Sequence, residues 1–212
     1  MRAIAVLGGT FDPIHHGHLR LACEARDGLD LDGVALLPAG TPVHRNAPVA
    51  NAAQRRRMLE LAIDDEPGLR VDLREVERVG PSYMVDTLQA LRSELPKTSL
   101  SLILGVDAFA LLDTWYQWER LLGLAHLIVA DRPGSTVPET GPIGQLWARA
   151  GTEDKSRVRN EPSGAIFRLQ APLLEISSTR VRKLRRDGRS IRYLVPQTVC
   201  QFICEENLYR HG

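Results

Sequence analysis

Three glycines and three histidines lie near the N-terminus, in the stretch GGTFDPIHHGHLR at positions 8–20. His15 and His18 are three residues apart, so on the first turn of a helix their imidazoles project from about the same face. A helix N-terminus also offers unpaired backbone N–H groups and the positive end of the helix dipole, which together attract phosphate. Glycines let the backbone approach such a ligand closely, here at Gly8, Gly9 and Gly17. These residues predict a polyphosphate-binding site.

Other patterns explain this stretch less well. It matches neither the P-loop pattern G-x-x-x-x-G-K-[ST] nor the dinucleotide pattern G-x-G-x-x-G. A His-x-x-His pair by itself is more typical of a surface turn or a metal-binding pair. The neighbouring glycines, the sequence Phe11–Asp12–Pro13 and the apolar run before them favour phosphate binding.

The elements that must position these residues alternate between strands and helices. Strands are predicted from apolar or alternating runs at 3–7, 33–38, 70–77, 99–105, 125–130 and 163–169. Helices are predicted at 17–28, 52–65 after a cap at Asn51, 83–95 after Ser82, 107–112, 118–124, 178–187 and 196–207. The Pro- and Gly-rich stretch 131–145 is expected to be a loop or small insertion. The alternation predicts an α/β fold, Rossmann-like and doubly wound, with a mainly parallel sheet and helices on both faces.

Length and composition set broad limits. The 212 residues fit one domain, 1–212, with a C-terminal helical portion at about 177–212. A net charge of +1 argues against a chain that coats nucleic acid or an anionic membrane, and the basic runs 55–57 and 179–192 are expected to be solvated faces. The odd and low number of cysteines, three, argues against a disulfide framework, and no apolar stretch approaches the roughly 20 residues that span a bilayer. We therefore expect a cytoplasmic protein, with a homo-oligomer possible.

A second candidate phosphate-binding stretch, ISSTRVR, lies at 176–182. Ser177 and Ser178 can supply cap oxygens and N–H groups at a helix start, and Arg182 follows about one turn later, where it can bind a phosphate bidentately. The box His15-His16-Gly17-His18 and this second stretch, in this order, resemble the two signatures of the HxGH nucleotidyltransferase superfamily.

Further stretches are similar to the bacterial nicotinate-mononucleotide adenylyltransferases, namely PAGTPVHR (38–45), RVGPSYMVDTL (78–88), LILGVDAF (102–109), LLDTWYQWERL (111–121) and VADRPG (129–134). The resemblance implies transfer of AMP from ATP to nicotinate mononucleotide, which yields nicotinate adenine dinucleotide and pyrophosphate in NAD biosynthesis. Nicotinamide mononucleotide and phosphopantetheine remain alternative acceptors. The phosphopantetheine enzymes share the two signatures, but they lack the PSY and TW stretches and usually have a shorter chain.

The resemblance also implies roles for individual residues. The catalytic residues would be His15, His18 and Arg182. ATP would be bound by Gly8, Gly9, Thr10, Phe11, Gly17, Gly105, Asp107, Ile176, Ser177 and Ser178. The mononucleotide would be bound by His44, Arg45, Tyr83, Met84, Trp115 and Arg132.

Two of these positions carry a separate chemical expectation. Trp115 offers a flat face on which a pyridine ring can stack. Met84 stands where the resembled family commonly has Thr, so a hydroxyl is lost and acid-versus-amide selectivity stays open. Mg²⁺ is expected to accompany ATP without a dedicated protein metal site, and neither nucleic acid nor membrane is an expected partner.

Overall fold

The computed structural model describes residues 1–40, 47–131, 136–170, 172 and 174–210. Within them a seven-stranded sheet has the order β3-β2-β1-β4-β5-β7-β6, and every neighbouring pair is parallel. The strands are β1 (Ala3–Gly9), β2 (Gly33–Pro38), β3 (Leu69–Val71), β4 (Ser99–Gly105), β5 (His126–Ala130), β6 (Gly151–Thr152) and β7 (Ile166–Leu169). This arrangement confirms the predicted fold class.

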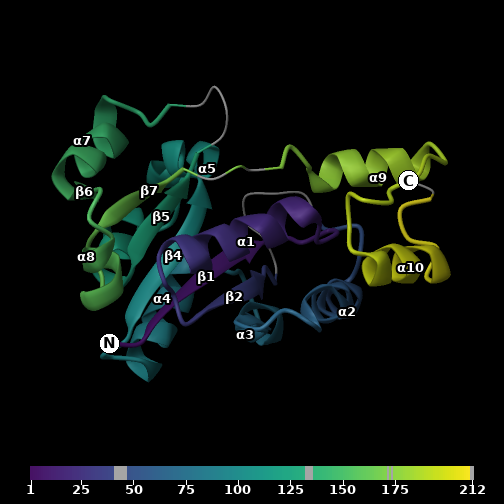
Figure 1. Cartoon of the computed structure of the whole chain (residues 1–212), viewed down its shortest axis with the longest axis horizontal. Helices are drawn as coiled ribbons and strands as arrows, with labels where there is room; N and C mark the ends of the chain where they lie inside the picture. Colours follow the sequence, from purple (N-terminus) through teal and green to yellow (C-terminus); the bar gives the residue numbers. More distant parts are fainter. Residues whose placement is uncertain (41–46, 132–135, 171, 173, 211–212) are drawn as a thin grey trace.

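Helices connect these strands and extend beyond the sheet at its C-terminal end (Figure 1). They are α1 (His16–Gly28), α2 (Ala52–Ile63), α3 (Arg74–Glu77), α4 (Met84–Glu94), α5 (Val106–Ala110), α6 (Leu121–Leu124), α7 (Gly141–Ala150), α8 (Lys155–Asn160), α9 (Ser178–Arg186) and α10 (Gln197–Glu205). Two 3₁₀ turns, η1 (Leu112–Thr114) and η2 (Trp118–Arg120), follow α5. No helix in the described part of the chain is both long enough and apolar enough to cross a membrane.

Helices cover both faces of the sheet, which explains why its strands read as continuous apolar runs. Successive residues of β1 point to opposite faces: Ala5 and Leu7 pack into one core cluster, whereas Ile4 and Val6 pack into the other. The first cluster includes buried residues of α1, α2, α8, α9 and α10. The second includes buried residues of α4, α5, α6 and α7.

Three sequence predictions differ from the structure. The half-exposed strand predicted at 70–77 is wrong, because β3 ends at Val71 and α3 forms from Arg74. The side chain of Asp72 accepts the backbone N–H of Arg74 at 3.1 Å, which turns the chain out of the strand. The loop predicted at 131–145 stops earlier, since α7 begins at Gly141, and helix α4 is capped by Tyr83 rather than started by Ser82.

The strand order reverses around β1, which has β2 on one side and β4 on the other. In open parallel sheets the loops on the two sides of such a switch point diverge and leave a crevice at the carboxyl ends of the strands. Gly8 and Gly9 end β1 and Gly105 ends β4, so three of the predicted ATP-binding glycines lie at this crevice.

His126, at the start of β5, is a buried histidine remote in sequence from the predicted site. Its Nδ1 accepts the backbone N–H of Ala165 at 3.0 Å, and its Nε2 lies 2.8 Å from the carbonyl oxygen of Glu161. This pairing fits the neutral ring with the proton on Nε2. Burial lowers the pKa of His126 below its usual value.

We expect the free energy of unfolding to fall as pH drops below about 6.5, the unfolded-state pKa of histidine. The unfolded chain then binds a proton that folded His126 resists, so the stability present above that pH is lost toward the lower folded pKa. Urea denaturation at a series of pH values tests this. His126→Gln should flatten the slope, whereas His16→Gln should retain it; equal slopes in both variants would contradict the assignment.

Candidate active site

The two predicted imidazoles share one face at the start of α1. His15 is the N-cap residue, and its ring stacks on that of His18 with centroids 3.6 Å apart and planes inclined by 19°. The ring of Phe11 packs edge-on against His18 at 5.0 Å. The two imidazoles thus share one face as predicted, although His15 is the extended N-cap residue and only His18 lies in the first turn of the helix.

The second predicted stretch meets the first one. Arg182 donates from Nη1 to the carbonyl oxygen of Asp12 at 2.7 Å, and the same nitrogen lies 3.9 Å from Asp12 Oδ2. Ser178 donates from Oγ to the carbonyl oxygen of Pro13 at 2.9 Å. Ser177 caps α9 by accepting the N–H of Arg180, and Ile176 packs against the core. Residues separated by about 170 positions thus converge on one loop.

Gly17 marks how closely the two segments approach. A Cβ added there would lie 3.0 Å from the ring of His15 and 3.2 Å from the carbonyl oxygen of Leu174. Both distances are tighter than ordinary van der Waals contact, so a side chain would push the chain leading into α9 away from the histidines. Glycine at position 17 therefore allows the histidine loop and the chain before α9 to pack closely together, in addition to any contact with a ligand.

Asp12 binds these segments together, although its side chain was not among the predicted site residues. The carboxylate is 3% exposed. Its Oδ2 accepts the N–H of Val49 at 2.8 Å, and its Oδ1 accepts the N–H of Ala50 at 3.0 Å and the hydroxyl of Tyr209 at 2.7 Å. Burial and the charge of Asp12 raise the pKa of Tyr209, so the phenol remains a donor.

Arg55 is buried and bonds to the loop after β1. The expectation that the whole run 55–57 is a solvated face is therefore wrong for this residue. Arg55 is 2% exposed, and its Nη1 donates to the carbonyl oxygens of Thr10 at 3.1 Å and Ala39 at 2.7 Å. It thereby ties the loop after β1 to the loop after β2. Arg56 does pair at the surface with Glu60.

A pocket of about 490 Å³ opens beside the histidine loop. Its lining comes from the ends of β1 and β4, from the loop after β2, and from α3, α4, α5 and the following turn. The lining residues are Gly8, Gly9, Thr10, Ala39, Glu75, Ser82, Tyr83, Met84, Leu102, Leu104, Ala108, Leu111, Thr114, Trp115 and Tyr116. The structure thus brings the predicted acceptor-binding residues Tyr83, Met84 and Trp115 into one cavity.

Two features of this pocket escaped the sequence analysis. Tyr116 is 49% exposed and packs on Tyr83 with ring centroids 4.5 Å apart, so it adds a second aromatic face at the mouth. Gly8 faces the side chain of Met84, whose Cε would lie 2.9 Å from an added Cβ. A sequence pattern does not show whether an aromatic residue lines a pocket or packs in the core. It also does not show which side chain packs against a glycine.

The predicted adenosine contacts lie at the end of β4. Gly105 has φ −71° and ψ 151°, which any residue adopts, and a Cβ built there meets no described atom within 4 Å. Neither backbone strain nor packing among the described residues demands this glycine. Asp107 stands exposed in the first turn of α5. His44, Arg45 and Arg132, also predicted to bind substrate, lie outside the described residues.

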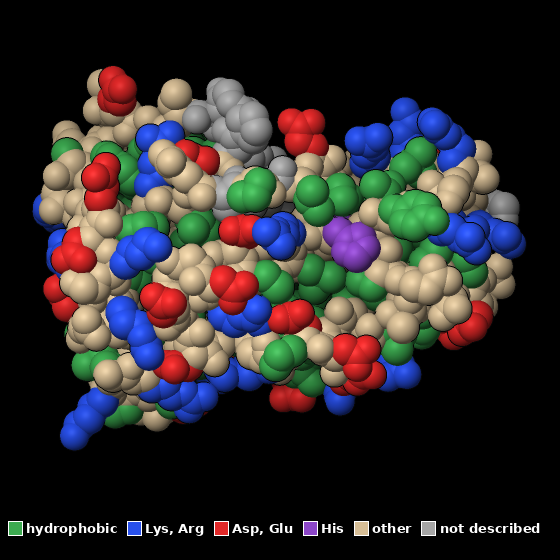
Figure 2. Space-filling view, viewed as in Figure 1, with side chains coloured by type: hydrophobic (Ala, Val, Ile, Leu, Met, Phe, Trp, Pro, Cys, Tyr) green, Lys and Arg blue, Asp and Glu red, His purple; other side chains and the backbone are tan. Residues whose placement is uncertain are grey.

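The electrostatic surroundings of the site are asymmetric. Lys and Arg side chains gather over α9, whose last turn contains Lys183, Arg185 and Arg186 (Figure 2). Histidine atoms reach the surface between this basic face and the body of the sheet. Across the described ranges, no three His, Cys, Asp or Glu side chains form a group that could hold a metal ion.

Tyr209→Phe is expected to lower the free energy of unfolding by about 1.5–3 kcal/mol, the range for a hydrogen bond to a charged group. The variant keeps the ring packing and removes the donor to Asp12. Tyr193→Phe is the matched control, because Tyr193 is 88% exposed and should lose almost nothing. Urea denaturation of both variants measures the difference, and equal stabilities would show that the bond to Asp12 contributes little.

Comparisons with known proteins show the family of this chain. The family model described as cytidylyltransferase-like matches residues 6–184. The chain is 49% identical over 208 residues to a probable nicotinate-nucleotide adenylyltransferase of Cellvibrio japonicus, covering 98% of each chain. It is 45% identical to a protein of the same name from Marinobacter nauticus, covering 96% of this chain and 95% of that one.

The fold is also similar to a solved structure of Plasmodium falciparum nicotinic acid mononucleotide adenylyltransferase, described as complexed with NaAD. The TM-score is 0.77 at 17% sequence identity, and the match covers 100% of this chain and 99% of that one. The full-length identities above 40% and the matched domain establish the relationship, and the neighbour supports the fold. This chain therefore belongs to the nicotinate-nucleotide adenylyltransferase family, within the cytidylyltransferase-like proteins.

Proposed function

We propose that this protein transfers the adenylyl group of ATP to nicotinate mononucleotide, which forms nicotinate adenine dinucleotide and pyrophosphate in NAD biosynthesis. The observation that carries the proposal is the convergence of the stacked pair His15 and His18 with Arg182 on the loop at the switch point of the sheet. Imidazoles, a guanidinium and a helix N-terminus form a donor set for a triphosphate.

The reaction needs no activated side-chain nucleophile. An oxygen of the mononucleotide phosphate is already ionised near neutral pH and attacks the α-phosphorus of ATP. A new P–O bond forms there while the bond from the α-phosphorus to the bridging oxygen breaks, and pyrophosphate leaves with that electron pair. Catalysis then consists of aligning the two phosphates and stabilising the charge on their oxygens.

The site residues divide this work. His18 contacts the α-phosphate and its transition state, whereas His15 and Arg182 hold the β- and γ-phosphates and the departing pyrophosphate. The guanidinium of Arg182 keeps its bond to the carbonyl of Asp12, which uses one of its nitrogens and leaves further donors for phosphate oxygens. Gly8, Gly9, Thr10, Phe11, Gly17, Ile176, Ser177 and Ser178 shape the loops around the triphosphate.

The adenosine is proposed to lie at the end of β4, against Gly105 and Asp107. The open space at the missing Cβ of Gly105 supports close approach of a nucleoside, because the fold itself does not require glycine there. ATP would enter with Mg²⁺, an ion that typically keeps several waters and needs few protein carboxylates. When bound, the ion would supply positive charge that offsets the charge of the phosphates.

The mononucleotide is proposed to occupy the neighbouring pocket. Trp115 supplies a stacking face for the pyridine ring, and Tyr83 and Met84 stand at the start of α4, where N–H groups and the helix dipole favour a ring carboxylate. His44 and Arg45 are proposed to bind the mononucleotide phosphate, with Arg132 as a further substrate contact. Met84 keeps its backbone N–H but offers no hydroxyl to the ring substituent.

Turnover with ATP and each candidate acceptor tests the activity. Release of pyrophosphate is followed with nicotinate mononucleotide, nicotinamide mononucleotide and phosphopantetheine in parallel. We expect the nicotinate form to give the highest kcat/KM. A higher value with either other acceptor would replace the proposed substrate, and no release with any of them would contradict the proposed activity.

His18→Ala is expected to lower kcat by at least about 10², the scale reported for removing one preorganised donor to a transition state. The fold should survive, because the ring contacts Phe11 and His15 near the surface of the site. Steady-state kinetics and the circular dichroism spectrum provide the two measurements. His16→Ala, on the adjacent position of α1, is the control; near-normal turnover of the His18 variant would remove His18 from the mechanism.

A further inference from the structure

A buried carboxyl group, that of Glu75, lines the proposed acceptor pocket. It stands on α3, is 4% exposed and lines the pocket together with Tyr83, Met84 and Trp115. Among the described lining residues, no other bears a carboxyl, guanidinium, ammonium or imidazole group. A negative charge at Glu75 is therefore not balanced by a cation among those lining residues.

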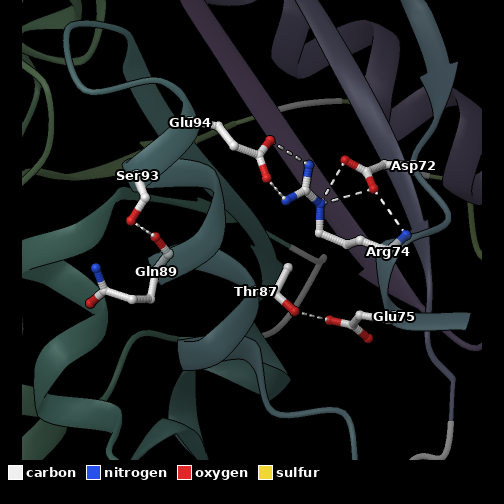
Figure 3. A network of polar contacts seen from close by, with 7 residues as sticks. All are labelled: Asp72, Arg74, Glu75, Thr87, Gln89, Ser93 and Glu94. Carbon is white, nitrogen blue, oxygen red and sulfur yellow. Dashed lines mark hydrogen bonds and ion pairs between the residues drawn. The ribbon is translucent and has the colours of Figure 1, made fainter. Parts of the chain in front are cut away.

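The position of Glu75 is fixed by its neighbours (Figure 3). Thr87, one turn into α4, donates from Oγ1 to Glu75 Oε1 at 2.8 Å. The carbonyl oxygen of Glu75 packs so closely on Gly40 that an added Cβ at Gly40 would collide with it. Gly40 in turn donates its N–H to Ser82 Oγ at 3.2 Å. The carboxyl is thus held at the junction of α3, α4 and the loop after β2.

Opposing influences act on the protonation of this carboxyl. Burial is the largest and raises the pKa of Glu75 above its usual value, and the nearby charge of Asp72 acts in the same direction. The hydrogen bond from Thr87 and the positive charge of Arg78 lower the pKa. The net effect is a raised pKa, so the neutral carboxyl is more accessible than on an exposed glutamate.

We propose that Glu75 is a specificity-determining residue whose charge state biases the pocket between a ring carboxylate and a ring carboxamide. The proposal rests on the proposed function. Neutral Glu75 can donate a hydrogen bond toward the carboxylate of nicotinate mononucleotide, whereas ionised Glu75 repels it. The carboxamide of nicotinamide mononucleotide carries N–H donors, which ionised Glu75 accepts.

A defined pH dependence of selectivity follows. As pH rises through the pKa of Glu75, the carboxyl loses its proton, nicotinate mononucleotide binds less well and nicotinamide mononucleotide gains relative to it. By linkage, the bound nicotinate ring raises the pKa of Glu75 further and promotes uptake of a proton. Met84 strengthens this dependence because it offers the ring substituent no competing hydroxyl.

The test is the ratio of kcat/KM for nicotinate mononucleotide to kcat/KM for nicotinamide mononucleotide, measured from about pH 4, near the usual pKa of a glutamate carboxyl, to mildly alkaline pH. Both acceptors carry the same phosphate and meet the same histidines, so their shared titrations cancel in the ratio. The wild-type ratio is expected to fall by about tenfold with rising pH, which corresponds to a coupling of one pKa unit. In Glu75→Gln, which keeps the shape of the side chain but cannot ionise, the ratio should be constant.

Two further variants separate this role from a structural one. Thr87→Val removes a hydrogen bond that lowers the pKa of Glu75, so the fall in the ratio should move to higher pH. Glu94→Gln is the matched control: Glu94 pairs with Arg74 across the same junction of α3 and α4 but lies outside the pocket lining (Figure 3). Its ratio should follow that of the wild type.

A binding measurement keeps the result independent of turnover. The tryptophan fluorescence of the protein, to which Trp115, Trp118 and Trp147 contribute, should be partly quenched when nicotinate mononucleotide stacks on Trp115. The apparent Kd should rise with pH in the wild type more steeply than in Glu75→Gln. A constant wild-type ratio, or an equal fall in Glu75→Gln, overturns the proposal while the activity stands. If neither mononucleotide is turned over or bound, the proposed function fails and this inference fails with it.

Discussion

The site depends on how one buried carboxylate is solvated by the protein. A buried charge is costly unless it is hydrogen-bonded, so Asp12 requires donors in place of water. Those donors come from the segment before α2, through Val49 and Ala50, and from the C-terminal Tyr209. The carbonyl of the same residue receives Arg182. The contacts of Asp12 therefore join the guanidinium of Arg182, on α9, to the loop that holds the histidines.

The backbone around Asp12 is held in place by the sheet and by Arg55. The reversal of strand order at β1 opens a crevice. Arg55 holds together the loop after β1 and the loop after β2, because it donates to the carbonyl oxygens of Thr10 and Ala39. Helices on both faces bury the sheet, so the polar groups available for chemistry are concentrated at the carboxyl ends of the strands. The loop that holds the histidines and the pocket beside it adjoin because Gly8 and Gly9, which end β1, also line the pocket.

The sequence predicted what depends on local pattern and missed what depends on tertiary contact. Buried strands can be recognised in the sequence as apolar runs, and the predicted strands 33–38 and 99–105 match the observed ones residue for residue. The run 70–77 alternates like a strand, yet the turn at Asp72 diverts it. The two motif stretches predicted His15, His18 and Arg182, which the structure brings to one loop. The burial of Arg55, Glu75 and Tyr209 depends on tertiary contacts that no local pattern shows.

The contact between Tyr209 and Asp12 joins residues 197 positions apart, and that separation bears on how the chain acquires activity. Contacts between distant residues carry a larger loop-closure entropy and form late in folding. The strand pairs β1–β2 and β1–β4 need much shorter loops, so the sheet and the histidine loop can form before α9 and α10 dock. The separation of 170 positions between Asp12 and Arg182 has the same consequence, so we expect the guanidinium to reach the histidine loop among the last contacts that the folding chain makes.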